Sequence, residues 1–448
     1  MKKLVAFICM LWVIPLVVPY ISGSVDLGGQ AIAQEKKKTR RVPAMRESTY
    51  KRLAEAQVMI DPESAPREEG EPAPVPKGTP RDAINLLLKL KDRRGLNSYE
   101  LAQVWNTLAF GYYTIEDVPN TIRAYEQVLA QGTITQALEQ SVLRALFQLY
   151  YSQEQYAKSI QYMEKWEALR EQPDAGVTFI KATAYYQMDR FRDALKTALL
   201  VEQIALQQQK TIREKWWYLQ VVIYNELVEI DNVIAVLEKL IVNYPKKQYW
   251  MHLAGMYGEK NWDDLSLSAY YAIYTQGMFD KESEVVMLSQ RLLNAEVPFE
   301  AATILEKGFK DGLIKETEKN LKLLATAYTM AQEMSKAIDA WRDATKFTKD
   351  GVLYYRLAQA LANEDRHKAA TVAYQDALDA GKLKDLGDVN FWYGISLMQL
   401  ENWERAIKAF RASAKADRTM AKQCRQYIRY IQGERRRQAE LRKMLAGE

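Results

Sequence analysis

The chain has 448 residues, a formal net charge of +5 and only two cysteines. This length exceeds that of a typical single compact domain, so we expect several domains or an array of repeats. The mild charge does not indicate a nucleic-acid-binding protein. With only 13 prolines and 20 glycines, the composition favours long helices over many short strands.

The first segment, residues 1–33, has the pattern of a secretory signal peptide. Lys2 and Lys3 precede an apolar run from Leu4 to Ile21, and residues 31–33 read Ala-Ile-Ala, a cleavage site between small residues. We therefore expect this segment to direct export and to be removed. The alternative is an uncleaved anchor, because the apolar run approaches the length that spans a bilayer.

The next stretch predicts a basic segment followed by a first helical hairpin. Residues 34–46 are basic, and we expect them to be flexible. Within residues 47–98, Tyr50–Ile60 and Arg81–Lys91 have the pattern of two amphipathic helices. Residues 61–80 between them are rich in Pro and Glu, a composition that cannot bury enough apolar surface to order itself. We interpret 61–80 as a disordered insertion into the hairpin turn; the alternative is a linker between an N-terminal helix and an array of repeats.

Residues 99–417 repeat one pattern. A Tyr or Leu recurs in the same context at intervals of 33 to 39 residues. The nine positions are Tyr112, Tyr150, Tyr185, Tyr224, Tyr257, Leu292, Tyr328, Leu361 and Leu397. In most copies a small residue follows about nine positions later, and a large residue four positions after that. Small residues let the two helices of a hairpin approach closely, and large residues fill the groove against the next hairpin.

A period near 34 residues with helix–turn–helix content is typical of the tetratricopeptide repeat (TPR), and this array resembles that family. Trp105 and Trp217 stand at the family's Trp position and Pro245 at its closing Pro, whereas Lys181 replaces the usual Leu. The resemblance implies an all-α fold, an α-α superhelical solenoid of about nine to ten TPR-like hairpins. Residues 418–448 would form a capping helix and a charged tail, with Cys424 as a buried apolar residue.

Patterns of catalysis and metal binding are missing from the sequence. The two histidines, His252 and His367, lie in different repeats, and there is no HExxH, GxSxG, GxGxxG or phosphate loop. We therefore expect no enzyme activity, no metal and no cofactor. An enzyme that presents its substrate on the repeats is the alternative, but no stretch of about 100 residues remains outside them to form a catalytic domain.

The groove-facing positions of the repeat pattern provide the predicted binding surface. In the N-terminal half they are Asn106, Phe110, Tyr113, Arg144, Tyr151, Phe179, Tyr186, Tyr218 and Asn225. In the C-terminal half they are Tyr355, Gln359, Asn363, Phe391 and Gln399. Aromatic side chains bury much area at a small entropic cost, which suits an extended peptide or a partner helix. The alternative is that these aromatic residues pack between adjacent helices.

The N-terminal third also resembles the periplasmic TPR proteins associated with TonB systems in gammaproteobacteria. The shared stretches are STYKRLAEAQ and LNSYELAQVWNTLAFGYYTIEDVPNTIRAYEQVL. The resemblance implies a non-catalytic periplasmic scaffold, an accessory component of TonB-dependent uptake whose partners are proteins or peptides of the cell envelope. The alternative is a scaffold for envelope assembly or for polysaccharide or pilus export, tethered to the membrane if the anchor is retained.

Two basic runs, Lys36–Arg41 and Arg435–Arg437, complete the sequence-based expectations. We interpret both as solvated segments near the ends of the chain. The alternative is contact with an anionic membrane surface. We expect no nucleic-acid partner.

Overall fold

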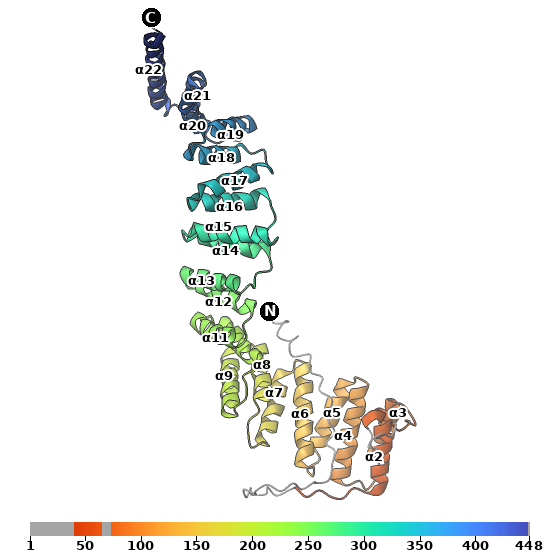
Figure 1. Cartoon of the computed structure of the whole chain (residues 1–448). Helices are drawn as coiled ribbons and strands as arrows, with labels where there is room; N and C mark the ends of the chain where they lie inside the picture. Colours follow the sequence, from red (N-terminus) through yellow and green to blue (C-terminus); the bar gives the residue numbers. More distant parts are fainter. Residues whose placement is uncertain (1–39, 65–72, 447–448) are drawn as a thin grey trace, which may run out of the picture. The chain divides into compact units, whose positions relative to one another are not determined.

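The computed structural model describes residues 40–64 and 73–446; the predicted signal segment 1–33 lies outside them. Within these ranges the regular elements are helices, and α2 to α21 form ten hairpins followed by a last helix, α22 (Figure 1). The chain divides into two compact units, Met1–Tyr244 and Pro245–Glu448. Each unit by itself is a stack of helical hairpins, which confirms the predicted all-α solenoid class.

The first unit contains five hairpins. Its helices are α2 (Glu47–Ile60), α3 (Pro80–Lys91), α4 (Ser98–Thr114), α5 (Val118–Leu129), α6 (Gln136–Ser152), α7 (Tyr156–Ala168), α8 (Ala175–Gln187), α9 (Phe191–Gln207), α10 (Glu214–Glu226) and α11 (Ile230–Asn243). A short 3-10 helix, η1 (Pro62–Ser64), follows α2. The odd-numbered helix of each hairpin also packs against the even-numbered helix of the next, so the hairpins stack in chain order.

The second unit contains five more hairpins and α22. Its helices are α12 (Lys247–Glu259), α13 (Asp263–Thr275), α14 (Glu282–Asn294), α15 (Pro298–Lys310), α16 (Glu318–Met330), α17 (Met334–Thr345), α18 (Gly351–Asn363), α19 (His367–Ala380), α20 (Leu386–Gln399), α21 (Trp403–Ala416) and α22 (Ala421–Ala446). One hydrophobic core runs through this unit from Ala254 to Ile431.

The first hairpin is formed by α2 and α3, which pack against each other. Its second helix begins with a capping box: the Asp82 N–H donates to the Thr79 hydroxyl, and the Thr79 N–H donates to the Asp82 carboxylate. Residues 65–72, the middle of the predicted insertion, lie outside the described residues. Its disorder therefore stays a prediction.

The hairpin turns have the same period as the sequence repeat. From α4 onward, the residue four positions after each repeat residue has a left-handed backbone, with φ between 54° and 61°. These nine residues are Glu116, Glu154, Asp189, Val228, Asn261, Glu296, Gln332, Asp365 and Glu401. The next N–H in each turn donates to the carbonyl of the repeat residue at 2.8–3.0 Å. Each even-numbered helix from α4 onward therefore ends two residues after its repeat residue, whose carbonyl accepts the hydrogen bond that closes the turn.

Packing inside the hairpins follows the predicted pattern of small and large residues. The small residues nine positions after the repeat residue are fully buried: Thr121, Ser159, Ala194, Ala301, Ala337, Ala370 and Ala406. At the equivalent position of the α12–α13 hairpin, nine residues after Tyr257, the Ser266 hydroxyl donates to the Ala254 carbonyl at 2.8 Å. The large residues four positions later are also buried: Tyr125, Met163, Leu237, Leu305, Trp341, Tyr374 and Phe410. These contacts confirm the packing role given to both positions.

The first half of α22 covers the last hairpin. Cys424 and Ile431 are fully buried, and Cys424 is a free thiol. The Tyr427 ring stacks on Phe410 at 5.3 Å between centroids and meets Phe391 edge-on at 5.6 Å. The predicted capping helix is therefore present, and it closes the apolar face of α20 and α21.

Candidate peptide-binding surface

The candidate surface of the first unit is built from its even-numbered helices, which the hairpin stacking brings to one side. The Tyr151 hydroxyl of α6 donates to the Thr183 hydroxyl of α8 at 3.1 Å. From α8 to α10, the Lys215 ammonium lies over the Phe179 ring, 5.0 Å from its centroid. Side chains of neighbouring even-numbered helices therefore touch, and they can form one continuous face.

The open part of this face lies on α4 and α6. On α4, Asn106 and Phe110 are half-buried and Tyr113 is 38 % exposed. On α6, Arg144 is exposed and Tyr151 is half-buried. Asn106, Phe110 and Tyr113 stand at i, i+4 and i+7 of α4, and Arg144 and Tyr151 stand at i and i+7 of α6, so each helix carries one stripe along a single side. The structure thus keeps five of the predicted residues accessible on two adjacent helices.

Gln148 belongs to the same surface, although sequence reasoning missed it. It stands four residues after Arg144 and three before Tyr151, at the repeat position that Phe110 occupies in α4, and it is exposed. Its spacing would have identified it, because Gln359 of the predicted C-terminal set stands at the same repeat position, two residues before Leu361. Its amide can both donate and accept, which suits the backbone of an extended peptide.

The part of the predicted surface on α8 is closed. Phe179 is buried, and Tyr186 is only 1 % exposed. The Tyr186 hydroxyl donates to Glu226 of α10 at 3.2 Å, and its ring packs against Phe191 at 5.6 Å. Burial and the neighbouring Glu226 carboxylate raise the pKa of Tyr186 to about 12. These two rings therefore stabilise the packing of α8, in contrast to the groove-facing role predicted for them.

Contact with α10 explains why this part closes. α10 packs directly against α8, and its Glu226 accepts the hydrogen bond from the Tyr186 hydroxyl. On α10, Tyr218 is half-buried and Asn225 is exposed at the edge of the contact. The predicted stripe is thus open over α4 and α6 and covered over α8.

In the second unit, the two predicted aromatic residues are part of the packing. The Tyr355 hydroxyl of α18 donates to Asp388 of α20. Phe391 is buried between Phe410 and Tyr427. The polar residues remain accessible: Asn363 and Gln399 are exposed, and Gln359 is half-buried. This face therefore presents amides, together with the exposed Trp392 ring seven residues before Gln399 on α20.

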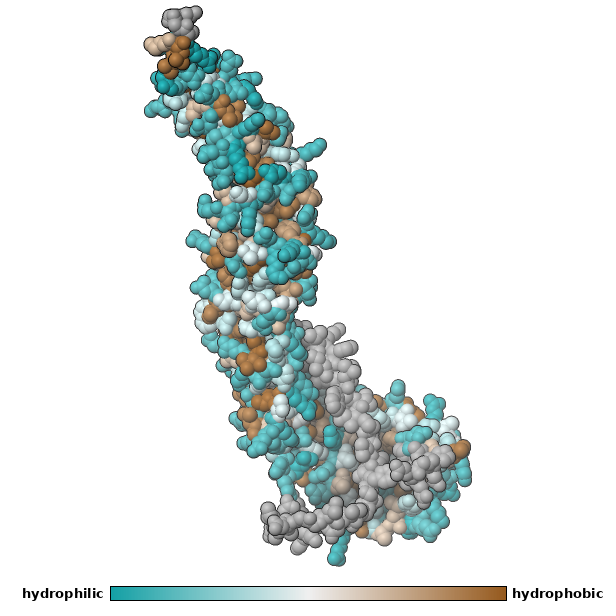
Figure 2. All heavy atoms as spheres, viewed as in Figure 1, coloured by the Kyte–Doolittle hydropathy of each residue, from teal (hydrophilic) through white to brown (hydrophobic). Residues whose placement is uncertain are grey.

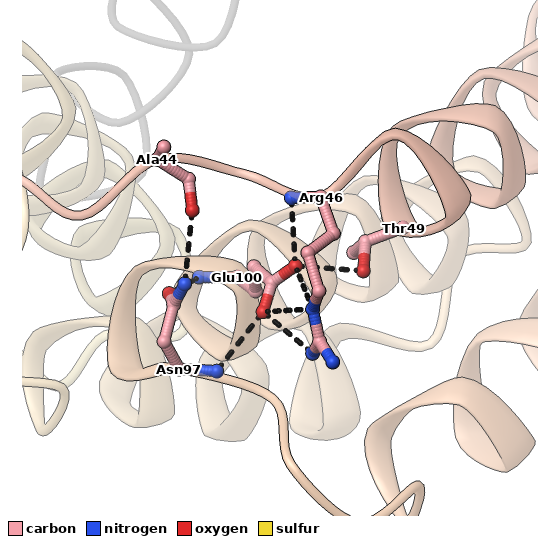
Figure 3. A network of polar contacts seen from close by, with 5 residues as sticks. All are labelled: Ala44, Arg46, Thr49, Asn97 and Glu100. Carbon is pink, nitrogen blue, oxygen red and sulfur yellow. Dashed lines mark hydrogen bonds and ion pairs between the residues drawn. The ribbon is translucent and has the colours of Figure 1, made fainter.

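A buried carboxylate at the start of α4 is the most strongly bonded charged group near the surface (Figure 3). The Glu100 side chain is fully buried and accepts hydrogen bonds from the Arg46 guanidinium at 2.7–3.2 Å, the Arg46 N–H at 3.0 Å and the Thr49 hydroxyl at 2.8 Å. The Asn97 N–H adds a fourth donor group at 3.0 Å, completing a capping box. The Arg46 hydrogen bonds lower the pKa of Glu100 to about 2 against the opposing effect of burial.

This network joins elements rather than preparing a reaction. Arg46 and Thr49 begin α2, whereas Asn97 and Glu100 begin α4. The Asn97 amide also donates to the Ala44 carbonyl at 3.0 Å. An ionised carboxylate whose oxygens are all occupied does not serve as a proton donor or acceptor at neutral pH. Its effect is to fix α2 and the preceding residues onto α4.

The two histidines lie apart from one another in the second unit. His252 is half-buried on α12, and burial lowers its pKa. His367 begins α19 and lines a shallow hollow with Arg366, Lys368, Val372 and Leu400. In the part of the chain that the structure describes, no three His, Cys, Asp or Glu side chains are grouped so that they could hold a metal ion. None of the helices in residues 40–64 and 73–446 has the length and apolar character needed to cross a bilayer.

Comparison with protein-family models gives no match. Comparison with curated proteins gives none either. Among solved structures, MamA is 19 % identical over 38 % of this chain and 97 % of its own, with a TM-score of 0.33. YrrB, a TPR protein with an unusual peptide-binding site, is 16 % identical over 40 % of this chain and 92 % of its own, with a TM-score of 0.33. The yeast Sti1 TPR2AB domain in complex with pHSP90 is 14 % identical over 65 % of this chain and 98 % of its own, with a TM-score of 0.28.

These similar structures include TPR proteins. The solenoid class assigned above rests on the helix pairing of this chain, in which successive hairpins pack on one another within each unit.

Proposed function

We propose that this protein is a non-catalytic scaffold that binds an extended peptide segment of a partner protein across α4 and α6. The observation that carries the proposal is the repeated stripe on these helices, Asn106, Phe110 and Tyr113 beside Arg144, Gln148 and Tyr151. Two stripes at matching positions present accessible aromatic rings next to groups that form hydrogen bonds. This combination is typical of surfaces that hold a peptide.

Each side chain of the surface has a distinct role in the proposed complex. Phe110, Tyr113 and Tyr151 would bury apolar area against side chains of the peptide, at a small cost in side-chain entropy. Asn106 and Gln148 would hydrogen-bond the peptide backbone. Arg144 would pair with a carboxylate of the partner, since its exposed guanidinium offers a planar fork of donors.

We further propose that the protein works in the periplasm as an accessory component of TonB-dependent uptake. The support is the signal pattern of residues 1–33 and the resemblance of the stretches STYKRLAEAQ and LNSYELAQVWNTLAFGYYTIEDVPNTIRAYEQVL. Most of the second stretch is α4 and α5, so the resemblance covers half of the proposed binding surface. A scaffold for envelope assembly or export is the alternative with the same surface.

The test is a photoreactive amino acid placed at Tyr113 in the full chain, followed by mass spectrometry of the proteins captured in cells. Tyr50 is the matched control position, because it is an exposed Tyr of the same unit, 60 % exposed on α2. Capture of TonB-system components at position 113 and not at position 50 is the expected result. Capture of envelope-assembly or export proteins would keep the scaffold and reject the TonB assignment.

Purified variants then test the surface with the captured partner. Tyr113→Ala and Arg144→Ala should each weaken binding about tenfold or more, as truncation of an interface anchor does. Tyr50→Ala should leave the affinity unchanged. Equal capture at positions 113 and 50, or equal affinities of all three variants, would reject the α4–α6 surface.

A further inference from the structure

The basic residues of the chain are concentrated in its last two helices. Residues 403–446, which contain α21 and α22, hold 13 Lys and Arg against four Asp and Glu. The rest of the chain holds 49 against 53, so its balance is slightly negative. The net charge of +5 is therefore the sum of a strongly basic region, residues 403–446, and a slightly acidic remainder of the chain.

Most of these cations form no ion pair with a described residue. Within the described residues, the ion pairs of this region are Arg435 with Glu404 at 3.8 Å and Arg437 with Glu434 at 2.6 Å. Arg436, Arg442 and Lys443, together with the cations of the first half of α22, form none. Uncompensated cations on one region attract anionic partners over roughly a Debye length, about 8–10 Å.

The contacts of α22 with the hairpin end well before the helix does. The last ones are the Arg435–Glu404 pair and a 3.5 Å hydrogen bond from the Gln438 amide to Glu401. The helix continues to Ala446, which is two further turns beyond Gln438. Isolated helical turns are marginal in water, so this part of α22 gains from a surface to lie on.

Three large apolar side chains lie on these turns. Leu441 is 46 % exposed, Met444 is 75 % exposed and Leu445 is 87 % exposed. Their spacing of three and four residues places them on one side of the helix, while Arg436, Arg442 and Lys443 occupy the other sides. Figure 2 shows brown hydrophobic atoms beside teal hydrophilic ones at this end of α22.

We propose that the last turns of α22 dock onto an anionic lipid bilayer surface. The cations would lie among the headgroups, and Leu441, Met444 and Leu445 would enter the boundary between headgroups and acyl chains. This inference is independent of the peptide surface on α4 and α6.

The mixture of charges and apolar residues selects lipid over other polyanions. A nucleic acid backbone would satisfy the cations but would leave three exposed Leu and Met side chains in water. A groove on an acidic protein recognises one face of a helix, whereas the cations of this helix occupy several of its sides. An anionic bilayer satisfies both features, because its headgroups flank the helix and its interior takes up the apolar side chains.

The test is co-sedimentation of the full chain with vesicles of phosphatidylcholine alone or with about 30 % phosphatidylglycerol, a typical anionic surface. The readout is the difference between binding to the vesicles that contain phosphatidylglycerol and binding to those of phosphatidylcholine alone. Insertion of the N-terminal apolar run into both vesicle types cancels in this difference. We expect a clear excess that falls steeply in about 0.5 M NaCl, because salt screens the cations.

Two variants separate the charge from the apolar contribution. Arg436→Glu, Arg442→Glu and Lys443→Glu together should lower anionic binding at least about a hundredfold, since each cation near such a surface contributes about fivefold. Met444→Ser with Leu445→Ser should lower it at least about tenfold. Matched controls are Lys319→Glu, Lys322→Glu and Lys349→Glu together, and Leu199→Ser with Leu206→Ser, all exposed positions outside α22.

Three outcomes would overturn the proposal. The first is equal binding to both vesicle types. The second is a loss of anionic binding in the charge variant but not in the apolar variant, combined with release of the protein from the vesicles by a mixed-sequence RNA. Together these two results would identify a general polyanion site. The third is undiminished anionic binding in both α22 variants, which would place the lipid contact elsewhere in the chain.

Discussion

Val228 is a β-branched residue in a left-handed turn, with φ of 59°. This conformation costs a non-glycine residue roughly 1–2 kcal/mol, and branching at Cβ makes it worse. The side chain is 76 % exposed, so its removal loses little packing. Val228→Asn should therefore stabilise the α10–α11 hairpin by about 0.5–1 kcal/mol. The measurement is amide hydrogen exchange in α10 and α11, which should be slower in the variant than in the wild type.

The equivalent turn of the next hairpin supplies the control for that prediction. Asn261 has φ of 57° and stands four residues after Tyr257, as Val228 stands four after Tyr224. Asn261→Val should therefore speed exchange in α12 and α13. Unchanged exchange in both variants would mean that the turn conformation does not limit the stability of these hairpins.

Glu100 is the residue whose removal should cost the first hairpin most. Glu100→Gln keeps the size of the side chain but leaves the Arg46 guanidinium and the surrounding N–H groups with a weaker, neutral acceptor. We expect a loss of about 1.5–3 kcal/mol, as for hydrogen bonds to a charged group. Urea unfolding, monitored by hydrogen exchange of the α2 amides, measures this loss of stability. Glu139→Gln is the matched control, because among the described residues Glu139 forms its ion pair with the exposed Arg40.

The same carboxylate makes the attachment of α2 sensitive to acid. Its pKa is lowered from an ordinary 4.5 to about 2, so its stabilising contribution is complete above the unfolded-state pKa and disappears as the pH falls toward 2. Exchange in α2 should rise between about pH 4.5 and 2 in the wild type. Glu100→Gln should flatten this rise; an equally steep rise in the variant would assign the acid sensitivity to other groups.

At the scale of the helices, close approach depends on a few glycines. A Cβ on Gly351, at the start of α18, would lie 2.2 Å from the Gly381 carbonyl oxygen and 2.5 Å from that of Ala377. Both are backbone atoms of the α19 end, so they cannot turn away. Gly351→Ala should therefore separate α18 from α19 and destabilise the second unit by about 1–3 kcal/mol.

Gly255 provides the opposite case in the same unit. It lies inside α12 and is exposed, and no atom lies within 4 Å of a Cβ placed there. Gly255→Ala should stabilise α12 by up to about 1 kcal/mol, because alanine is the better helix former. Thermal unfolding of both variants compares them directly. A loss of stability in both would contradict the assignment of Gly351 as a packing position.

At the scale of the whole molecule, the period of the sequence predicted the hairpins well. Counting from Tyr112 located the end of each even-numbered helix, since the left-handed turn residue follows four positions later in all nine cases. This succeeded because a hairpin is a local structure, closed by hydrogen bonds between residues five apart. The stacking of one hairpin on the next then follows from the buried small and large positions.

The accessibility of individual residues was not predictable in the same way. Tyr113 and Tyr186 occupy the same repeat position, yet Tyr113 is 38 % exposed and Tyr186 only 1 %. The difference comes from α10, which packs on α8 and supplies Glu226 as a partner. Likewise, Asn97 and Glu100 form a capping box, and Arg46 joins them from 54 residues away. Such contacts depend on the neighbour, which a repeat pattern does not specify.

The hairpin turns have a consequence for how such a chain can change in evolution. Each is closed by a backbone hydrogen bond, and its left-handed position accepts Glu, Asp, Asn, Gln and even Val. The hydrogen bond that closes each turn therefore joins backbone atoms alone. A duplication or deletion of one whole period brings together two turns of the same geometry. The number of hairpins can therefore change while each hairpin keeps the hydrogen bond that closes its turn. The length of the array can therefore change by one hairpin at a time.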